Sequence, residues 1–470
     1  MSARLRFLFA AVIVAVVALG GAAYVNRASA HDDAALLHDG VRIAGLDLGT
    51  FSGAGLASNQ NDRMLAQAYA YMENAYYKPV SDQTLLTGEQ RALLAFLKAK
   101  NISNAKLPAP VATGDRTRDL SLIEAQLAAA SRTYGRAGTA QQFAEVAMAG
   151  MLHSVGDPYT VYLFPAEIKA LEEELQGGAF GGIGVYIVQD PKTGAILVDP
   201  IDGNPAIKAG VRPGDTILAV DQTPVQGMRL DAVEGRIRGT LGSVVAVKVR
   251  HTHTNTVQTL HITRGEVRVP SVRAKMEDGI DYVRLADFGT NSAEEVRRAF
   301  LEGKAQHARG YILDLRNNGG GLLDAAVDIS SLVIPSGTIV ATIDRAGDRR
   351  ASYATGKTVT STPLVLLVNQ NTASASEITA GAIQDYNAGT IVGTRTFGKG
   401  VVQSLYELPD GGALKITTAR YVTPKGRDIQ HRGILPDYTV PQRTDLPIID
   451  TARDKQLARA KEIIDTKDHQ

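Results

Sequence analysis

The second half of the sequence alternates short apolar runs with amphipathic helical segments, and this alternation constrains the fold more than any other feature. The apolar runs include YVRLADF, GYILDLR, PLVLLVN and GTIVGT, and the segments between them include AEEVRRAFLEG, LLDAAVDISSLVI and ASEITAGAIQDY. Strands that alternate with helices form parallel sheets covered by helices. We therefore predict an α/β core with mostly parallel strands over residues 271–445.

The remaining regions differ from this core in pattern. Residues 63–177 carry apolar side chains at helical spacing, which predicts an N-terminal helical region. Residues 178–270 carry short apolar runs separated by Gly, Pro, Asn and Asp, which predicts a β-rich module. Residues 31–62 are expected to be a linker, and residues 446–470 a C-terminal helix and tail. A length of 470 residues fits such a multidomain chain, with α+β and α/β parts.

The N-terminus has the pattern of an export signal. Arg4 and Arg6 precede an apolar run over residues 7–25, and small residues allow cleavage after Ala30. The run is also about long enough to stay in a bilayer as an uncleaved anchor. We expect residues 1–30 to be a signal peptide or a membrane anchor, and the protein to be exported to the periplasm or another extracytoplasmic space. It would there be soluble after cleavage or anchored to the membrane.

Composition excludes several function classes. The chain has no cysteine, so a disulfide, a thiolate nucleophile and a cysteine metal site are ruled out. Of its 50 basic residues, Arg4, Arg6 and Arg27 lie in residues 1–30, which leaves 47 basic against 49 acidic residues in the rest. A near-neutral body gives no electrostatic basis for nucleic-acid binding. We expect no metal ion and no organic cofactor.

Two serines lie where the apolar run Leu364 to Val368 gives way to a helical pattern. A side chain at such a turn lies at the carboxyl edge of the sheet, beside the positive end of the helix and its amides. Ser376 fits the N-cap position of the helix. Ser374 has less structural reason to be a serine, and it is the candidate nucleophile.

A serine nucleophile needs a base, and the nearby sequence offers a lysine. Lys399 lies between two glycines in TRTFGKGVVQ, among apolar residues that penalise a charged ammonium and so favour the neutral amine. By local sequence alone it could equally be an exposed loop lysine. His431 is the one histidine in a loop of the core segment. A conventional Ser-His esterase therefore stays open as an alternative.

The β-rich module opens with a glycine-rich turn just before a strand. Glycine permits the dihedrals that aim successive amides at an anion such as a carboxylate, and an extended peptide can add to a strand whose edge is free. A facing helix would then select side chains. The residues expected to contact such a peptide are Gly182, Ile183, Gly184, Val185, Leu230, Val233 and Ile237. The alternative is a simple tight turn beside an ordinary core helix.

Several motifs, in order, resemble those of one family. The segments MLHSVGDPYTVYL, DLRNNGGGLLDAAV, NTASASEITAGAIQD, GTRTFGKGVVQ and LPDGGALKITTARYVTPKGRDIQHRGILPDY are similar to the signature of the carboxyl-terminal processing peptidases, or tail-specific proteases. The resemblance spans about residues 64–440, and residues 178–265 look like a PDZ domain of the bacterial type. It implies a serine endopeptidase that captures apolar C-terminal tails through the PDZ domain and cuts near the C-terminus of its target.

The resemblance also implies roles for single residues. Ser374 would be the nucleophile, Lys399 the general base and Gln403 the residue that orients the lysine. The amides of Gly320 and Ala375 would form the oxyanion hole, although Gly319 stands where the family usually has proline. A straight strand over residues 399–403 would separate Lys399 from Gln403 by about 13 Å. A bend is therefore required, and Gly400 could supply it.

Other expectations concern one more acidic residue and the partners. Asp385 returns to the helix face of Ser374 but lies about 16 Å further along the axis, so we expect a structural role for it. Protein substrates with apolar tails are the expected partners, and an adaptor protein would be compatible with them. The terminal amphipathic helices could join a homo-oligomer or pack on their own domain. A non-catalytic peptide- or ligand-binding protein on the same fold is the second alternative.

Overall fold

The computed structural model describes residues 60–168, 171, 180–190, 193–201, 203–228, 230–252, 254–267, 271–442, 449 and 453–468. The expected signal or anchor, and almost all of the expected linker, lie outside these ranges. The boundaries that we predicted near residues 177, 270 and 445 fall outside them as well and stay predictions. Within the described ranges, no helix is long and apolar enough to cross a membrane.

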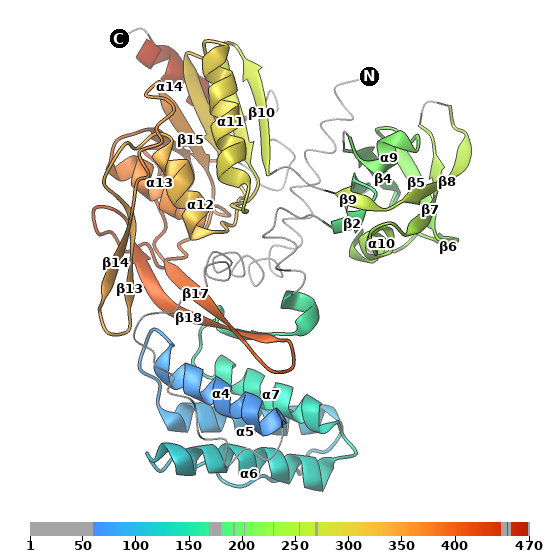
Figure 1. Cartoon of the computed structure of the whole chain (residues 1–470), viewed down its shortest axis with the longest axis vertical. Coiled ribbons are helices and arrows are strands. Elements are labelled where there is room, and N and C mark those ends of the chain that lie inside the picture. The colour runs from blue at the N-terminus through green and yellow to red at the C-terminus, as the bar shows by residue number, and fades with distance from the viewer. Residues whose placement is uncertain are drawn as a thin grey trace.

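The N-terminal helices pack into one bundle (Figure 1). They are α4 (Gln60–Asn74), α5 (Asp82–Ala99), α6 (Arg116–Tyr134) and α7 (Ala140–His153). Ser81, Asp115 and Thr139 cap the last three by accepting a hydrogen bond from an amide of the first turn. The bundle core also contains Leu414 and Ile416 of β18 (Ala413–Val422), a strand of a separate antiparallel sheet, so the bundle and that sheet share one apolar cluster.

The β-rich module forms a curled sheet of order β3-β4-β5-β7-β8, with β6 paired to β5 and a separate pair of β2 and β9. Its strands are β2 (Phe180–Gly182), β3 (Val185–Gln189), β4 (Ile196–Pro200), β5 (Asp215–Val220), β6 (Thr223–Pro224), β7 (Val244–Arg250), β8 (Val257–Thr263) and β9 (Gly265–Val267). Two helices, α9 (Pro205–Lys208) and α10 (Leu230–Ile237), complete it. Among the described residues, strand β3 has only β4 as a neighbour and is therefore an edge strand, as a peptide-adding strand must be.

The C-terminal core is built on a sheet of order β10-β11-β12-β15-β16-β19. All neighbours are parallel except β10, which pairs antiparallel with β11 at one edge. The strands are β10 (Val272–Glu277), β11 (Ile280–Leu285), β12 (Gly310–Asp314), β15 (Leu364–Val368), β16 (Thr390–Gly393) and β19 (Tyr438–Thr439). The predicted α/β core with mostly parallel strands is confirmed.

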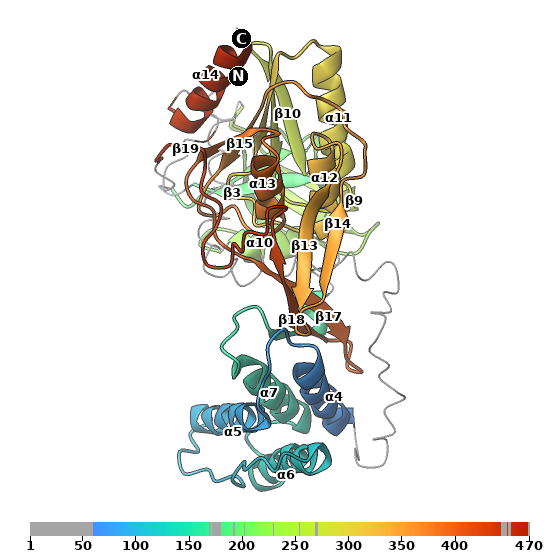
Figure 2. The ribbon, with the colours of Figure 1, turned by 90° about the vertical axis from the view of Figure 1, so that its left-hand side faces the viewer.

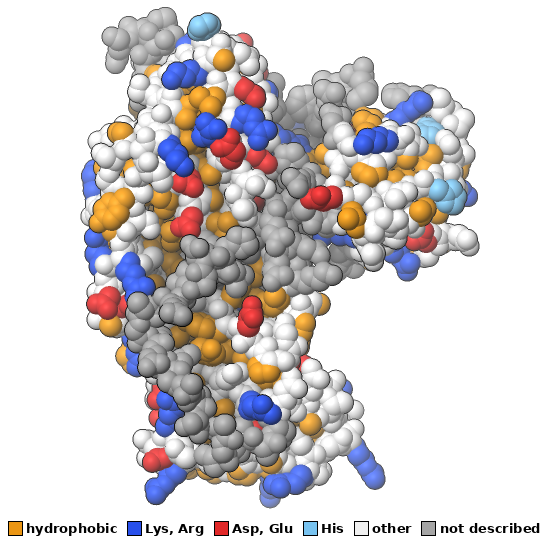
Figure 3. All heavy atoms as spheres, viewed as in Figure 1, with side chains coloured by type: hydrophobic (Ala, Val, Ile, Leu, Met, Phe, Trp, Pro, Cys, Tyr) orange, Lys and Arg blue, Asp and Glu red, His pale blue; other side chains and the backbone are white. Residues whose placement is uncertain are grey.

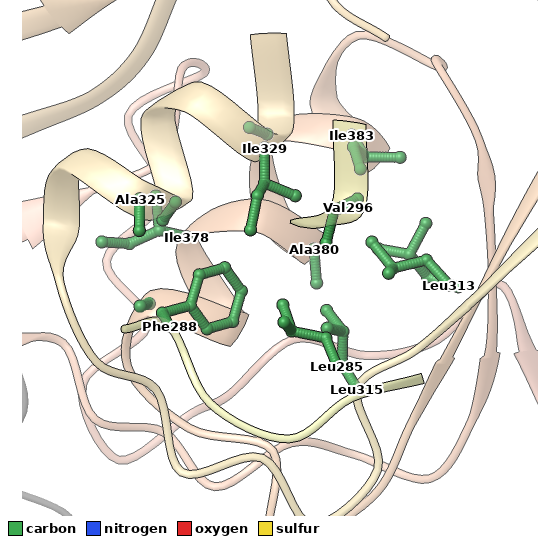
Figure 4. Packing of buried hydrophobic residues seen from close by; sticks show 14 of the residues in the cluster. Leu285, Phe288, Val296, Leu313, Leu315, Ala325, Ile329, Ile378, Ala380 and Ile383 are labelled. Atoms are coloured by element: carbon green, nitrogen blue, oxygen red, sulfur yellow. The ribbon is translucent and has the colours of Figure 1, made fainter. Parts of the chain in front are cut away.

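Helices cover both faces of this sheet. One face carries α11 (Ser292–Ala305), α12 (Leu323–Ser331) and α13 (Ala375–Asp385), whose apolar side chains meet those of β11 and β12 (Figure 4). The other face carries α14 (Lys455–Asp468), which packs through Leu457, Ala460 and Ile464. Alternate residues of β15 point to the two sides, Leu366 to the first cluster and Leu367 to the second. The C-terminal helix thus packs on its own domain.

A second, antiparallel sheet lies between the core and the helical bundle (Figures 1 and 2). It contains β1 (Val161–Leu163), β13 (Thr338–Asp344), β14 (Arg349–Tyr353), β17 (Val401–Glu407) and β18 (Ala413–Val422). Strand β18 pairs with β1, β13 and β17 and so joins segments from three parts of the sequence. On the face of the C-terminal core that Figure 3 shows, basic and acidic side chains are interspersed, in keeping with the near-neutral net charge of the sequence.

Candidate active site

Ser374 occupies a strained position between β15 and α13. Its φ of 57° and ψ of −119° lie in a region that residues other than glycine rarely adopt. Both backbone polar groups are bonded: the N–H donates to Glu377 Oε2 at 3.0 Å, and the carbonyl accepts the N–H groups of Glu377 and Ile378 at 2.7 and 2.9 Å. These bonds hold the serine at the amino end of the helix. The serine itself is almost fully buried.

The helix begins earlier than expected. The first residue of α13 is Ala375, so the N-cap residue is Ser374 and not Ser376. Ser376 lies inside the first turn, and its hydroxyl donates to the carbonyl of Asn318 at 3.1 Å. The expectation that Ser376 is the N-cap is therefore wrong. Ser376 instead ties the helix to the glycine-rich segment that follows β12.

Gly320 of that segment packs directly against the serine turn. It has a φ of +109°, and a Cβ on it would lie 2.8 Å from Ser374 Cβ and 3.0 Å from the Ala375 nitrogen, so only glycine fits. Its N–H donates to Asn318 Oδ1 at 2.9 Å. Ala375 is the first residue of α13, where amides have no carbonyl partner within the helix. Gly319 is buried beside them.

Lys399 is buried and lies close to the serine turn. Its side chain is 2 % exposed, and Nζ lies 5.2 Å from the centroid of the Tyr159 ring. Its N–H donates to Glu377 Oε2 at 2.9 Å, the same atom that Ser374 N–H reaches, so the two amide nitrogens are no more than about 6 Å apart. The hydroxyl of Tyr421 bonds to the carbonyls of both residues. The alternative of an exposed loop lysine is excluded.

Glu377 was missed by the sequence reasoning. Its carboxyl group is completely buried and accepts four hydrogen bonds, from the N–H groups of Ser374, Gly398 and Lys399 and from the hydroxyl of Thr396. Burial raises the pKa of Glu377 to about 7, while the four hydrogen bonds act in the opposite direction. The available signal was the Ser-x-x-Glu spacing of a capping box.

The backbone between Lys399 and Gln403 is irregular. Strand β17 begins at Val401, and its pairing with β18 is irregular between Val402 and Gln403, so residues 399–403 are not one straight strand. The Gln403 side chain is fully buried and donates to Thr417 Oγ1 at 3.4 Å, while its Oε1 has no hydrogen-bond partner among the described residues. Thr417 N–H donates to Thr160 Oγ1. Thr160 follows Tyr159 in the sequence, and the ring of Tyr159 contacts Lys399 Nζ.

The side chains of Asp385 and His431 make other contacts. Asp385 ends α13, where it accepts the Lys425 N–H at 2.8 Å and pairs with Arg427 at 2.5 Å. Its predicted structural role is confirmed. His431 is exposed, its N–H donates to the Gly398 carbonyl at 2.8 Å, and its ring nitrogen Nε2 lies 3.2 Å from Gln430 Nε2. Lys399 is buried beside the serine turn, whereas His431 faces solvent.

The predicted peptide contacts of the β-rich module divide into two groups. Ile183, Val233 and Ile237 are 1 %, 0 % and 5 % exposed and belong to the core of the module. Val185 and Leu230 are half-buried at its margin, on β3 and at the start of α10. A peptide added to the β3 edge would therefore meet these two side chains before the other three.

Packing explains one of the two glycines among the predicted contacts. Gly184 has a φ of +72°, and a Cβ there would lie 2.2 Å from Asn204 Cβ. Gly182 pairs with Gly265 across β2 and β9.

Across the described ranges, His, Asp and Glu side chains form no group of three or more that could hold a metal ion.

Known proteins match this chain over both the module and the core. Residues 279–440 match the family model of peptidase family S41, and residues 173–250 match that of the PDZ domain. A carboxyl-terminal-processing protease of Synechocystis sp. is 41 % identical over 298 residues, which are 62 % of this chain and 70 % of that protein. One of Picosynechococcus sp. is 40 % identical over 301 residues, or 63 % and 72 %. The solved structure of a photosystem II D1 C-terminal processing protease is 30 % identical, covers 85 % of this chain and 96 % of its own, and has a TM-score of 0.46.

Proposed function

Since the chain belongs to peptidase family S41, among the carboxyl-terminal-processing proteases, and carries a PDZ domain, we propose that Ser374 and Lys399 are its catalytic dyad. Membership of the family makes it a serine-type peptidase that acts on proteins. The observation that carries the dyad is the shared anchor: the backbone N–H groups of both residues donate to one oxygen of Glu377. No other lysine of the sequence is tied to the serine turn in this way within the described residues.

The dyad would work by nucleophilic catalysis. Neutral Lys399 takes the proton of the Ser374 hydroxyl, and Oγ attacks the carbonyl carbon of the scissile peptide bond. Collapse of the tetrahedral intermediate breaks the C–N bond, and the leaving amine takes the proton from Lys399. Water then attacks the acyl-enzyme, with Lys399 again moving the proton, and releases the new carboxyl end. Oε1 of Gln403, which has no hydrogen-bond partner among the described residues, would accept a hydrogen bond from the lysine and orient it.

The oxyanion would be held by backbone amides. The Ala375 N–H lies at the amino end of α13, where the helix dipole favours negative charge. The Gly320 N–H now donates to Asn318 Oδ1 and would exchange that acceptor for the oxyanion. The close packing of Gly320 against the serine turn supports this assignment.

We propose that the PDZ domain selects apolar C-terminal tails. A tail would add to the free edge of β3, with its carboxylate at the glycine-rich turn over residues 182–185 and its side chains against Val185 and Leu230. The pattern of residues 1–30 further suggests that the protein is exported, by a cleaved signal or with an anchor.

A tagged substrate with an apolar tail tests these proposals together. Wild-type protein should cleave it, and removal of its last few residues should slow cleavage. Folded Ser374→Ala and Lys399→Ala proteins should each lose at least about 1,000-fold in kcat, because a nucleophile and its base act as a unit. The His431→Ala protein, as the matched control, should keep its activity.

The opposite outcomes identify the alternatives. Undiminished cleavage by Ser374→Ala or Lys399→Ala would reject the dyad. Loss of activity in His431→Ala with retention in Lys399→Ala would identify a Ser-His esterase. A wild-type protein that binds the tail and never cuts it would be the non-catalytic binding protein.

A further inference from the structure

One buried carboxyl group joins the two segments that would carry the dyad. Glu377 is the third residue of α13, and its Oε2 accepts the N–H groups of Ser374 and Lys399 at 3.0 and 2.9 Å. Its Oε1 accepts the Gly398 N–H at 2.7 Å and the Thr396 hydroxyl. We call Glu377 and these four donors the carboxyl cluster. It bridges the serine turn and the lysine loop, which lie about 20 residues apart in the sequence.

The carboxyl cluster contacts the strained backbone of Ser374. Residues other than glycine rarely adopt the backbone conformation of Ser374, so surrounding contacts must fix it. The bond from Ser374 N–H to Glu377 Oε2 is one such contact, and the bond from Lys399 N–H to the same atom sets the lysine loop against it. Displacements of about 1 Å between reacting groups can cost about 100-fold in rate.

We propose that Glu377 is a positioning residue of the dyad, whose carboxylate holds the strained turn of Ser374 and the loop of Lys399 in one fixed arrangement. This inference rests on the proposed function, because it concerns the same dyad. Glu377 acts through the backbone of the two residues and is not itself assigned a contact with the substrate.

The hydrogen bonds require the ionised form of the side chain. All four partners are donors, and a carboxylate offers acceptor sites on both oxygens. A protonated carboxyl group, or the amide of glutamine, would place a hydrogen against at least one of these donors. Titratable side chains that contact the two segments of the cluster include Lys399, Tyr159 and Tyr421, and the Tyr421 hydroxyl bonds to the carbonyls of Ser374 and Lys399.

The test compares Glu377→Gln with Glu89→Gln, since Glu89 is equally buried but belongs to the helical bundle. We expect Glu377→Gln to lower kcat about 100-fold with KM for the tail substrate changed by less than about threefold. The Glu89→Gln protein should keep wild-type kinetics. In wild-type protein kcat should fall as the pH drops through about 7, where Glu377 takes up its proton, and this inflection should be missing in Glu377→Gln.

A folded Glu377→Gln protein that keeps kcat within about threefold of wild type, or keeps the inflection, overturns the inference. Thr396→Val serves if Glu377→Gln does not fold, because it removes one of the four donors and should move the wild-type inflection to higher pH. An unmoved inflection contradicts the role of Glu377. Ser374→Ala is measured alongside: if it is active, the proposed function fails, whereas an inactive Ser374→Ala with an active Glu377→Gln rejects this inference alone.

Discussion

Glu377 in the core and Glu89 in the helical bundle are both completely buried glutamates, but their surroundings differ. Glu377 accepts four hydrogen bonds, whereas Oε2 of Glu89 accepts one long bond from Gln126 Nε2 at 3.3 Å and its Oε1 has no partner among the described residues. Burial raises the pKa of Glu89 well above its usual range, while opposing hydrogen bonds limit that of Glu377 to about 7. Burial alone therefore makes a glutamic acid neutral, and convergent donors keep the carboxylate accessible near neutral pH.

Replacement of each glutamate by leucine should separate the two environments most strongly. Glu377→Leu leaves three backbone N–H groups and one hydroxyl without their acceptor, and we expect a loss of about 3 kcal/mol or more in the free energy of unfolding. Glu89→Leu removes an incompletely bonded polar group and should stay within about 1 kcal/mol of wild type. Urea unfolding at pH 7 measures both. Equal losses would show that the four donors of Glu377 contribute nothing beyond burial.

The pH dependence of stability should sharpen the comparison. A carboxyl group whose pKa is raised by folding contributes stability that is complete below its unfolded value of about 4.5 and is lost as the pH rises through the folded value. For Glu377 that loss should be over near pH 7, whereas for Glu89 it should continue to higher pH. Urea midpoints from pH 5 to 9 should therefore fall less steeply above pH 7 in Glu89→Gln than in wild type. Parallel curves would contradict a neutral Glu89.

The smallest difference is expected for a single donor at each site. Thr396→Val removes one bond to Glu377 and leaves the Ile434 N–H without its acceptor, which should cost about 1–2 kcal/mol. Gln126→Leu removes a long bond and an amide oxygen that has no partner within the described ranges, so it should change stability by less than about 1 kcal/mol. Thermal unfolding of the two variants provides the measurement. A larger loss in Gln126→Leu would reverse the ranking of the two regions.

The sequence predicted the parallel sheet but not the antiparallel one. The alternation of strand and helix patterns is local, so it can be recognised along the chain, and it predicted correctly that strands such as β11, β12, β15 and β16 are parallel. The antiparallel sheet depends on pairing between distant segments, such as Val161 with Lys415. No local pattern records such a partner, because either strand would look the same beside another neighbour.

The sequence by itself identified the side chains that we propose for the chemistry. It identified Ser374 in a strand-to-helix turn and Lys399 among glycines, and helix geometry alone separated Asp385 from the serine. Only the tertiary structure decided that Lys399 is buried, that Ile183, Val233 and Ile237 lie in a core, and that Glu377 ties the serine turn to the lysine loop. The physical reason is that burial and hydrogen-bond partners are set by segments that meet only after folding, whereas the rise and turn of one helix are fixed by its own backbone.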